Sequence, residues 1–392
     1  MGNAYIRAFN VGCGDCIFLV LHNKGKRYSI MVDCGCLTDE VKDFIKTDLQ
    51  YHINILIITH IDNDHIYGIG SIIQTLPNIT IDRILYNCCQ YTDLGKERIS
   101  LPDNIKSKLN KYKVGTNLPV GIKEIAASQA LTVAELIMKN ANLRNAWDKQ
   151  KDYITSESPN LKLPFGFGEL IFLSPEKKDI EALDLEFRKA FYTKFRLLYN
   201  GPYNDNESIY ETILKICNKE DVIQKHNIGY TNPTFSAIKY LCEIKDNNFI
   251  SPTNSASIAF VWECNGKSIL FCGDADPNII VRYYILKCKH TQSFPFQITA
   301  IKIPHHGSSH NSGGNFWETF DSFHIFITGG DLKEQRPSKI CLARIINRAT
   351  IKTRNIYYTR KNESISWFEK DIILKKELNY IFNNVAAYEF AY

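Results

Sequence analysis

The segment Ile53-Asn54-Ile55-Leu56-Ile57-Ile58-Thr59-His60-Ile61-Asp62-Asn63-Asp64-His65 decides the fold of this 392-residue chain. Residues 53–59 form a nearly continuous apolar run, which is typical of a strand buried on both faces. The next six residues hold four candidate metal ligands: His60, Asp62, Asp64 and His65. A solvent-exposed, Asp-rich turn is the ordinary alternative. Four ligand side chains directly after a buried strand argue against it, because α/β folds place their chemistry at strand ends.

These four side chains are able to hold two ions. A tight loop after the strand would direct alternate side chains into one space, with a helix over residues 66–75. His60 and Asp62 could then reach one ion, while Asp64 and His65 reach a second. Imidazole with carboxylate suits Zn²⁺, Mn²⁺ or Fe, and carboxylate oxygens shift the preference towards Mn²⁺. We therefore expect two divalent metal ions, zinc or manganese.

Two further apolar segments end in ligand side chains. Residues 268–272 lead into Gly273-Asp274, and residues 300–303 lead into Pro304-His305-His306-Gly307-Ser308. Asp274 could bridge two ions because a carboxylate has two oxygens, and one or both histidines could complete the site. An aspartate after glycine is by itself usually a turn residue, and paired histidines alone are only moderately suggestive. Three such strand ends in one chain predict a shared site.

The remaining pattern predicts one α/β scaffold, over residues 1–392, that carries two mainly helical insertions at about 89–160 and 176–250. The insertions lack the apolar runs of central strands. The second contains two amphipathic patterns, at 180–198 and 207–217. The strands that we expect in the scaffold are residues 5–9, 16–22, 28–33, 53–59, 83–87, 161–173, 256–263, 268–272, 300–303 and 324–328. The helices that we expect in it include residues 38–47, 66–75 and 277–288.

The motifs, in this order, resemble those of the metallo-β-lactamase superfamily, and most nearly its ComEC-like branch, the soluble domain of a DNA-uptake protein. The matching motifs are His60-x-Asp62-x-Asp64-His65, Gly273-Asp274 and Pro304-His305-His306-Gly307-Ser308. Phe9-Asn10-Val11-Gly12-Cys13-Gly14-Asp15-Cys16 resembles the opening glycine loop, and Met31-Val32-Asp33-Cys34-Gly35 resembles the first acidic motif. The resemblance covers about residues 4–87 and 255–365. It implies an α/β fold of four layers, an αββα sandwich.

The resemblance also implies the role of each site residue. His60 and Asp62 would bind one ion, Asp64 and His65 would bind the other, and Asp274 would bridge the two ions. His306 would be the last ligand. His305 would either replace His306 as that ligand or lie behind it. Asp33 would orient a ligand histidine. The implied reaction is hydrolysis by a metal-bound hydroxide, with His60 and Asp64 as the catalytic residues and Asp64 also orienting the nucleophile.

Two departures from the superfamily pattern concern the first ion and the substrate. Many members place another ligand histidine before the bridging aspartate, but this chain has Asn254-Ser255-Ala256-Ser257 there. The first site could therefore be poorly filled, labile, or loaded only with substrate. Where ComEC-like proteins often have His-Pro, this chain has Arg336-Pro337. Arg336 could contact a phosphate or be an ordinary surface residue.

The glycine-rich loop after the histidines offers further donors for a phosphate. Ser308, Ser309 and His310 lie there, and the alternative is that they cap the following helix. Cys13-x-x-Cys16 and Cys34-x-Cys36 could form a structural zinc site, but core packing is the more common fate of free cysteines. We expect Cys88-Cys89 to be buried at a strand end.

Composition places few limits on function. The formal net charge of +5 is compatible with an anionic substrate, and the twelve cysteines without a leader-like apolar run suggest a reduced, cytoplasmic protein with no membrane segment. The leading hypothesis is a phosphodiesterase or nuclease that acts on DNA or RNA, supported by four lysines within residues 105–113. That run is more often a solvated helix face. One alternative is a hydrolase of a small nucleotide or another small ester or amide. The other is an interaction module whose insertions bind a protein partner.

Overall fold

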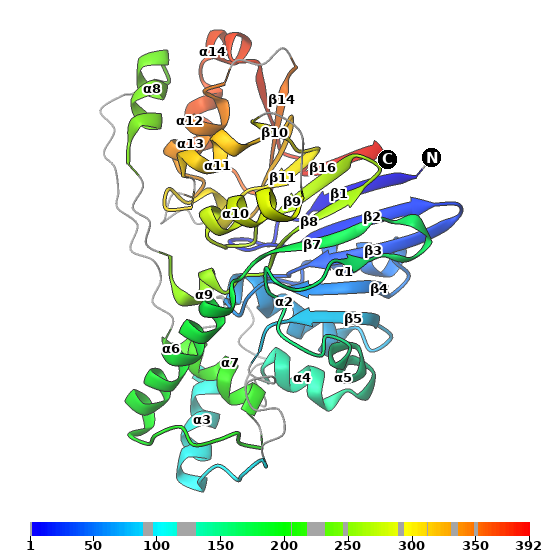
Figure 1. Cartoon of the computed structure of the whole chain (residues 1–392), viewed down its shortest axis with the longest axis vertical. Helices are drawn as coiled ribbons and strands as arrows, with labels where there is room; N and C mark the ends of the chain where they lie inside the picture. The colour runs from blue at the N-terminus through cyan, green and yellow to red at the C-terminus, as the bar shows by residue number, and fades with distance from the viewer. Residues whose placement is uncertain are drawn as a thin grey trace.

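The computed structural model describes residues 2–88, 97–115, 131–204, 206–217, 232–245, 250–288, 294–311, 313–330, 336–348 and 352–392. Two β-sheets face each other and helices cover their outer faces, as Figure 1 shows. Three buried apolar clusters fill the spaces between these layers: one between the sheets and one beneath each layer of helices. The architecture is therefore the expected four-layer αββα sandwich.

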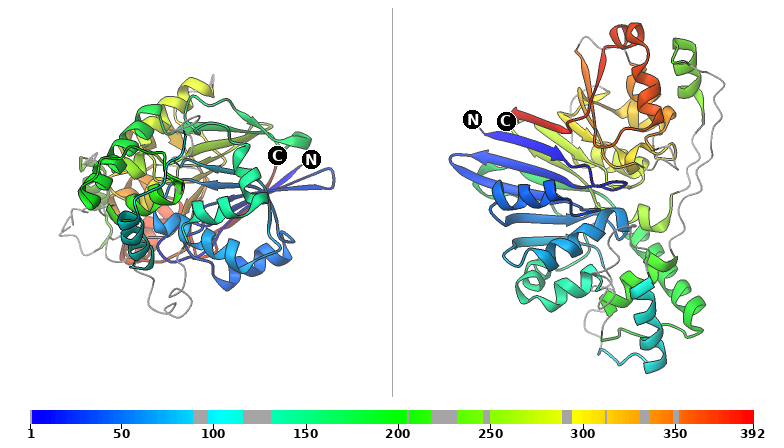
Figure 2. Two further views of the ribbon diagram at one scale, coloured as in Figure 1. Left: turned by 90° about the horizontal axis from the view of Figure 1, so that it is seen from below. Right: turned by 180° about the vertical axis from the view of Figure 1, so that it is seen from behind.

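The first sheet has six strands and is built mostly from the N-terminal part of the chain. Its order is β16 (Ala387–Ala391), β1 (Asn3–Ala8), β2 (Ile17–Asn23), β3 (Lys26–Val32), β4 (His52–Ile58) and β5 (Thr80–Tyr86). The pairs β3–β4 and β4–β5 are parallel, so these strands end at the same edge. The C-terminal strand β16 pairs antiparallel with β1, and this places the two chain ends side by side (Figure 2).

The second sheet has eight strands. Its order is β15 (Tyr380–Asn383), β14 (Arg354–Tyr358), β13 (His324–Ile327), β11 (Ala300–Lys302), β9 (Lys267–Phe271), β8 (Ala259–Cys264), β7 (Glu169–Ser174) and β6 (Leu161–Lys162). The five strands from β15 to β9 run parallel to one another. Consequently the segments that follow β9, β11 and β13 emerge at one edge.

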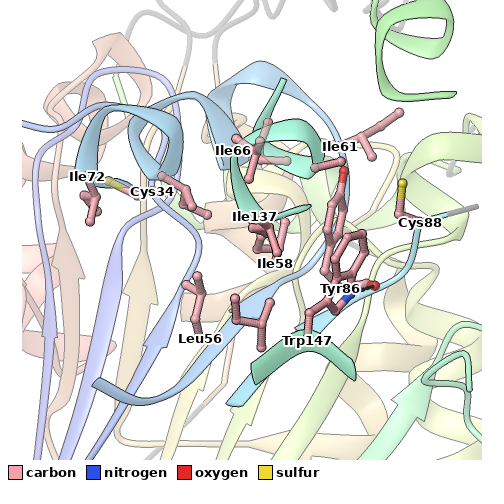
Figure 3. Packing of buried hydrophobic residues seen from close by; sticks show 14 of the residues in the cluster. Cys34, Leu56, Ile58, Ile61, Ile66, Ile72, Tyr86, Cys88, Ile137 and Trp147 are labelled. Atoms are coloured by element: carbon pink, nitrogen blue, oxygen red, sulfur yellow. Dashed lines mark hydrogen bonds between the residues drawn. The ribbon is translucent and has the colours of Figure 1, made fainter. Parts of the chain in front are cut away.

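Strand β4 is buried on both faces, as its apolar run predicts. Ile55 and Ile57 point into the cluster between the two sheets. Leu56 and Ile58 point into the cluster beneath the helices (Figure 3). Residues 55–58 therefore have no solvent-facing side, and Thr59, directly after the strand, is also buried.

The helices form two outer layers. Those associated with the first sheet are α1 (Asp39–Thr47), α2 (Asn63–Thr75), α4 (Val133–Lys139) and α5 (Ala141–Asp148). Those associated with the second sheet are α8 (Phe235–Glu243), α10 (Pro277–Lys287), α11 (Gly314–Thr319), α12 (Lys339–Ile346), α13 (Glu363–Glu369) and α14 (Ile372–Glu377). The other helices are α3 (Asp103–Gly115), α6 (Lys177–Phe195), α7 (Asn206–Cys217) and α9 (Pro252–Ser255). None of the helices in the described part of the chain is long and apolar enough to cross a lipid bilayer.

The helical segments of the two expected insertions pack onto the scaffold. Helix α4 contacts α2, α5 contacts β5, and α8 contacts α12. Trp147 of α5 stacks on Tyr86 of β5, and its indole N–H donates to the Tyr86 carbonyl at 3.1 Å (Figure 3). The lysine run falls on α3, where Lys106 and Lys108 are exposed. That the whole chain forms a single domain stays a prediction.

Several helix and strand boundaries differ from those that the sequence predicts. Helix α2 begins at Asn63, three residues before the expected start, so Asp64 and His65 lie on a helix instead of a loop. The polar residues of this first turn hide its helical period, and Asp62 stands at the N-cap. The expected strand at 161–173 is divided into β6 and β7 by a short 3₁₀ turn, Pro164–Gly166. The expected strands end at 328, whereas the structure continues with α12, β14, α13, α14, β15 and β16.

Helix α2 can lie close to the loop that contains Cys34 only because Gly68 has no side chain. A Cβ at Gly68 would lie 2.5 Å from the sulfur and 2.7 Å from the carbonyl oxygen of Cys34. The Gly68 N–H donates to that same carbonyl at 2.7 Å. A Cβ at Gly70 would meet only ordinary contacts, at 3.5 and 3.6 Å, with Val133 and Leu136.

We predict that Gly68→Ala destabilises the protein by about 2 kcal/mol, because overpacking must push α2 away from Cys34. Gly70→Ala, two residues further on, is the matched control and should be neutral or stabilising by up to about 1 kcal/mol, since alanine favours a helix. Urea unfolding of both variants measures the difference. Equal stabilities would contradict the close packing of α2 against the loop.

Candidate metal centre

The candidate ligands come from three strand ends that meet at one edge of the sandwich. His60 follows β4 of the first sheet. Asp274 follows β9 of the second sheet, and His305 and His306 lie in a 3₁₀ turn, Pro304–Gly307, directly after β11. Because β9 and β11 are parallel neighbours, their ends bring these side chains together opposite the end of β4. The Ile258 N–H donates to the Thr59 carbonyl at 2.9 Å and ties the two sheets together here.

All four histidines use Nδ1 for a hydrogen bond. The Nδ1 partners are Thr59 Oγ1 for His60 (3.0 Å), Asp33 Oδ2 for His65 (2.8 Å), Asn311 Oδ1 for His305 (2.8 Å) and the Thr328 carbonyl for His306 (2.9 Å). The last three partners are pure acceptors, so Nδ1 donates. Thr59 Oγ1 gives its own hydrogen to Asp33 at 2.6 Å, so it accepts from His60. In neutral imidazoles this leaves each Nε2 with a lone pair for a metal ion.

The Nε2 atoms converge on a single oxygen of Asp274. Oδ2 lies 3.5 Å from Nε2 of His65, 3.5 Å from that of His305, 3.7 Å from that of His306 and 4.0 Å from that of His60. The other oxygen, Oδ1, lies 3.7 Å from the Lys302 ammonium. We expected a bridge with one oxygen for each ion. The structure instead presents Oδ2 alone to all four histidines.

Asp62 and Asp64 lie on the open side of the cluster. Asp62 Oδ2 is 3.6 Å from His60 Nε2, and Asp64 Oδ2 is 3.3 Å from His306 Nε2. Their side chains are 20% and 33% exposed, whereas the histidine side chains are at most 4% exposed. The histidines therefore form a buried floor, and these two carboxylates face solvent.

The cluster fits divalent ions. Nε2 of His60 and Oδ1 of Asp274 are buried and make no hydrogen bond. Two sets of ligand atoms lie within 4.8 Å of one another: His60, His65 and Asp274, and Asp64, His65 and His306. Two ligands that share a tetrahedral ion at about 2.1 Å lie roughly 3.4 Å apart, which is close to the separations found here.

The carboxylates and imidazoles of the cluster shift the pKa values of one another. Burial of the Asp274 carboxylate acts to raise its pKa, but the positive charge of the surrounding histidines holds that pKa well below its ordinary value. Burial acts to lower the pKa of His306, but the negative charges of Asp274 and Asp15 raise that pKa to about 9. Asp274 and Asp64 likewise raise the pKa of His65 above its ordinary value, against the effect of burial. An ion that binds these imidazoles must displace protons.

The predicted orienting residue, Asp33, lies behind the ligands. It is fully buried and accepts hydrogen bonds from the Thr59 N–H (2.7 Å), the Thr59 hydroxyl (2.6 Å) and His65 Nδ1 (2.8 Å). Through Thr59 it also fixes the ring of His60. A further buried group, Asp15 with Asp33 and His65, is within reach of one ion, but its carboxylates already have hydrogen-bond or ion-pair partners.

The proposed substrate residues have different surroundings. Ser308 is buried and forms part of the turn: its N–H donates to the His305 carbonyl, and its hydroxyl accepts from the His310 N–H. His310 is buried and Ser309 is partly exposed. None of these three caps the next helix, because the N-cap of α11 is Gly313. Burial and the nearby positive charge of Arg336 lower the pKa of His305 to about 3, so Arg336 lies near the site.

A serine stands near the place where the expected ligand histidine is missing. A Cβ at Gly273 would lie 3.4 Å from Cβ of both Ser257 and Thr59, so Ser257 lies between two of the ligand-bearing segments. It is fully buried, and its hydroxyl makes no hydrogen bond. Its side chain is too short to replace an imidazole ligand. The first ion would therefore depend on His60, His65 and Asp274, with Asp62 beside His60.

The cysteine motifs lie apart from this chemistry. Cys16 and Cys34 are buried in the apolar cluster beneath α2, and Cys13 is exposed. No cysteine belongs to a group that could hold a metal among the described residues. Cys88 is buried, and Cys89 lies outside the described residues.

Sequence reasoning missed four residues that contact the candidate ligands: Asp15, Asn311, Thr328 and Lys302. Asp15 lies in the glycine loop. Asn311 follows the histidine motif after β11, and Thr328 follows β13. Lys302 had the clearest signal, because it interrupts the apolar strand at 300–303 immediately before the histidine motif.

Two facing sheets, two outer layers of helices and ligands gathered at the strand ends define a metallo-β-lactamase fold. Residues 12–81 match the family model of the metallo-beta-lactamase superfamily. This match and the architecture together support membership of that superfamily, whose members are generally metal-dependent hydrolases. The ComEC-like branch stays a prediction.

Comparisons with whole proteins are more distant. No curated protein matches the sequence. A solved structure of a CmlA beta-hydroxylase mutant has a TM-score of 0.37 and 10% identity, covering 99% of this chain and 53% of its own. This chain thus spans about half the length of that protein. The metallo-beta-lactamase fold protein YhfI from Bacillus subtilis has a TM-score of 0.33 and 9% identity, covering 99% of both chains.

We predict that Asp33→Asn weakens the binding of Mn²⁺ or Zn²⁺ by about 10- to 100-fold, because it removes the charge that orients His65. Asp82→Asn is the matched control. Asp82 also accepts from a histidine, His52, at 3.0 Å, but it is 54% exposed and its partner is not a candidate ligand. Calorimetric titration of metal-stripped protein measures both affinities. Unchanged binding by Asp33→Asn would contradict the orienting role.

Proposed function

We propose that this protein is a metal-dependent hydrolase that cleaves phosphodiester bonds in DNA or RNA. The general part, metal-dependent hydrolysis, rests on the fold and the ligand cluster. The choice of a phosphodiester rests on the positive charge of Arg336 beside the cluster. The resemblance of the motifs to the ComEC-like branch supports the same choice.

Arg336 is the observation that carries the choice of substrate. A phosphodiester is an anion, and a guanidinium group can donate two parallel hydrogen bonds to its oxygens. Arg336 lies close enough to His305 for its positive charge to lower the pKa of that imidazole. It is only partly buried, so a bound phosphate could contact both the metal centre and this side chain.

The exposed carboxylates define the side from which a substrate would approach. Asp62 and Asp64 are the ligands that face solvent, so the bond to be cleaved would lie over them. Divalent ions held there would lower the pKa of a bound water and offset negative charge on the phosphate oxygens. Asp64, whose Oδ2 lies 3.3 Å from Nε2 of His306, would help to hold an ion and could accept a hydrogen bond from the attacking water.

Two cavities in the described part of the protein lie away from the metal centre. One of about 600 Å³ is lined by Arg83, Lys149, Tyr153 and neighbouring residues, and one of about 570 Å³ lies at the β8–β9 turn near Asn265. Neither is lined by a candidate ligand. These two cavities are therefore separate from the candidate metal centre.

The proposal is tested by offering the metal-loaded protein single-stranded DNA, duplex DNA, RNA and cyclic dinucleotides, with Mn²⁺ and Zn²⁺ in parallel. Cleavage of a polymer supports the proposal. Cleavage of cyclic dinucleotides alone would replace it with a small-nucleotide hydrolase. Metal binding without cleavage of any phosphodiester would contradict it, and would favour an interaction module whose helical insertions bind a protein partner.

We predict that Asp64→Asn lowers the cleavage rate by roughly 100-fold or more, because the site loses an anionic ligand and the acceptor for the attacking water. Asp39→Asn is the matched control, since Asp39 also lies in the first turn of a helix but belongs to α1. Initial rates at saturating metal compare the two variants. Equal rates for Asp64→Asn and the wild type would rule out this site as the nuclease centre.

We predict that Arg336→Gln raises KM for a phosphodiester by about 10-fold, the loss expected for a charge-assisted hydrogen bond. KM is measured at saturating metal, because removing the charge of Arg336 also changes the electrostatic surroundings of His305. Arg144→Gln, at an exposed position on α5, is the control. A wild-type KM for Arg336→Gln would remove the main support for a phosphate substrate.

A further inference from the structure

A buried ion pair lies directly behind the ligands and has no part in the chemistry described above. Lys302 is the last residue of β11, and its side chain is 1% exposed. Its ammonium lies 2.5 Å from Asp15 Oδ2 and donates to the Gly273 carbonyl at 3.0 Å. It also lies 3.7 Å from Asp274 Oδ1. A lysine in the middle of the second sheet is therefore aimed at the segment that carries the central carboxylate.

The partner of the lysine comes from the other sheet. Asp15 follows the glycine loop between β1 and β2 and is 1% exposed. Its Oδ1 accepts from the Thr328 hydroxyl at 2.5 Å and lies 3.2 Å from His306 Nδ1. The pair thus touches two candidate ligands, one through each residue.

Stability alone is a poor explanation for this pair. The free energy needed to remove a lysine and an aspartate from water commonly exceeds the favourable energy of their attraction. Proteins with apolar residues of similar volume in place of such a pair are often as stable or more stable. The sites around Lys302 in the sheet are apolar, since it pairs with Phe271 and Phe326. A methionine or leucine would match those neighbours better.

The geometry around Asp274 gives the lysine a specific task. Asp274 is buried and its two oxygens have different surroundings: Oδ2 faces four imidazoles, and Oδ1 faces Lys302. A cation on the Oδ1 side, anchored to the Gly273 carbonyl, disfavours rotation of the carboxylate. The orientation that leaves Oδ2 for the ions is therefore favoured before any ion binds.

We propose that Lys302 and Asp15 are positioning residues of the metal centre. Lys302 holds Asp274 with Oδ2 towards the histidines, and Asp15 holds Lys302 and steadies the His306 ring. This inference rests on the metal-binding part of the proposed function and does not depend on which bond is cleaved.

The experiment compares removal of one charge with removal of both. Lys302→Met and Asp15→Asn each leave a buried charge without its partner, and both should lower the unfolding temperature. The double variant Asp15→Asn/Lys302→Met leaves neither charge, so its unfolding temperature should return close to that of the wild type. Its affinity for Mn²⁺, titrated into metal-stripped protein, should nevertheless stay about 10- to 100-fold weaker.

A second ion pair, which involves a residue of the same sheet, provides the control. Arg354 of β14 is fully buried and pairs with Asp321 at 2.7 Å, away from the ligands. Asp321→Asn/Arg354→Met should change stability without changing Mn²⁺ affinity. The visible absorption spectrum of the Co²⁺-loaded protein gives a further readout, since a rotated Asp274 changes the ligand field. The spectrum should change for the Lys302 variants and not for the control.

Thr328→Val provides a milder test that leaves every charge in place. It removes the donor to Asp15 Oδ1 and should weaken Mn²⁺ binding several-fold. Wild-type Mn²⁺ affinity and Co²⁺ spectrum in the Asp15/Lys302 double variant, or in Thr328→Val if the double variant does not fold, would overturn the inference and leave the pair a structural link. A wild-type protein that binds no divalent metal would overturn both proposals. Tight metal binding without phosphodiester cleavage, with weakened binding in the variants, would overturn the substrate proposal alone.

Discussion

The carboxylate of Asp33 is the constraint on which the rest of the site depends. It sits at the end of β3, where its backbone adopts a positive φ of 57°, and it accepts three hydrogen bonds from the end of β4 and the start of α2. One bond orients His65 directly, and the hydroxyl of Thr59 relays the same orientation to His60. Because β3 and β4 are parallel neighbours, this contact needs only two adjacent strand ends. Half of the imidazole floor is thus fixed by a single buried anion.

The other half of the floor depends on the second sheet. His305 and His306 both have positive φ values, 45° and 52°, within the turn after β11. That strained turn is held by the His305 N–H, which donates to the Gly273 carbonyl, and by the Ser308 N–H, which donates back to His305. Backbone strain of this kind persists only where the surroundings determine the conformation. Here it directs two consecutive imidazoles into one space, which a helix or a strand could not do.

The sequence contained enough to predict the sandwich and the set of ligands that gathers at its edge. The apolar run before His60, the Gly-Asp pair after β9 and the histidine pair after β11 each lie at a strand end, and strand ends of one sheet meet. It did not contain the start of α2, since Asn63, Asp64 and His65 have no helical period of apolar side chains. Nor could spacing distinguish His305 from His306, because both face Asp274 and the difference lies in the acceptors of Nδ1. The long-range partners Asp15 and Thr328 become visible only once the two sheets are in place.

The two sheets meet at the site through backbone contacts as well as side chains. A Cβ at Gly14 would lie 1.6 Å from the Asp64 carbonyl oxygen, and one at Gly329 would lie 2.0 Å from that of Cys13. The glycine loop is therefore wedged between the ligand-bearing helix of the first sheet and the end of β13 in the second. The ligand cluster combines residues from both sheets, so it forms only when the glycine loop is packed between them. An ion that joined His65 to His306 would also join the two sheets, so its binding would be coupled to the packing of the two halves.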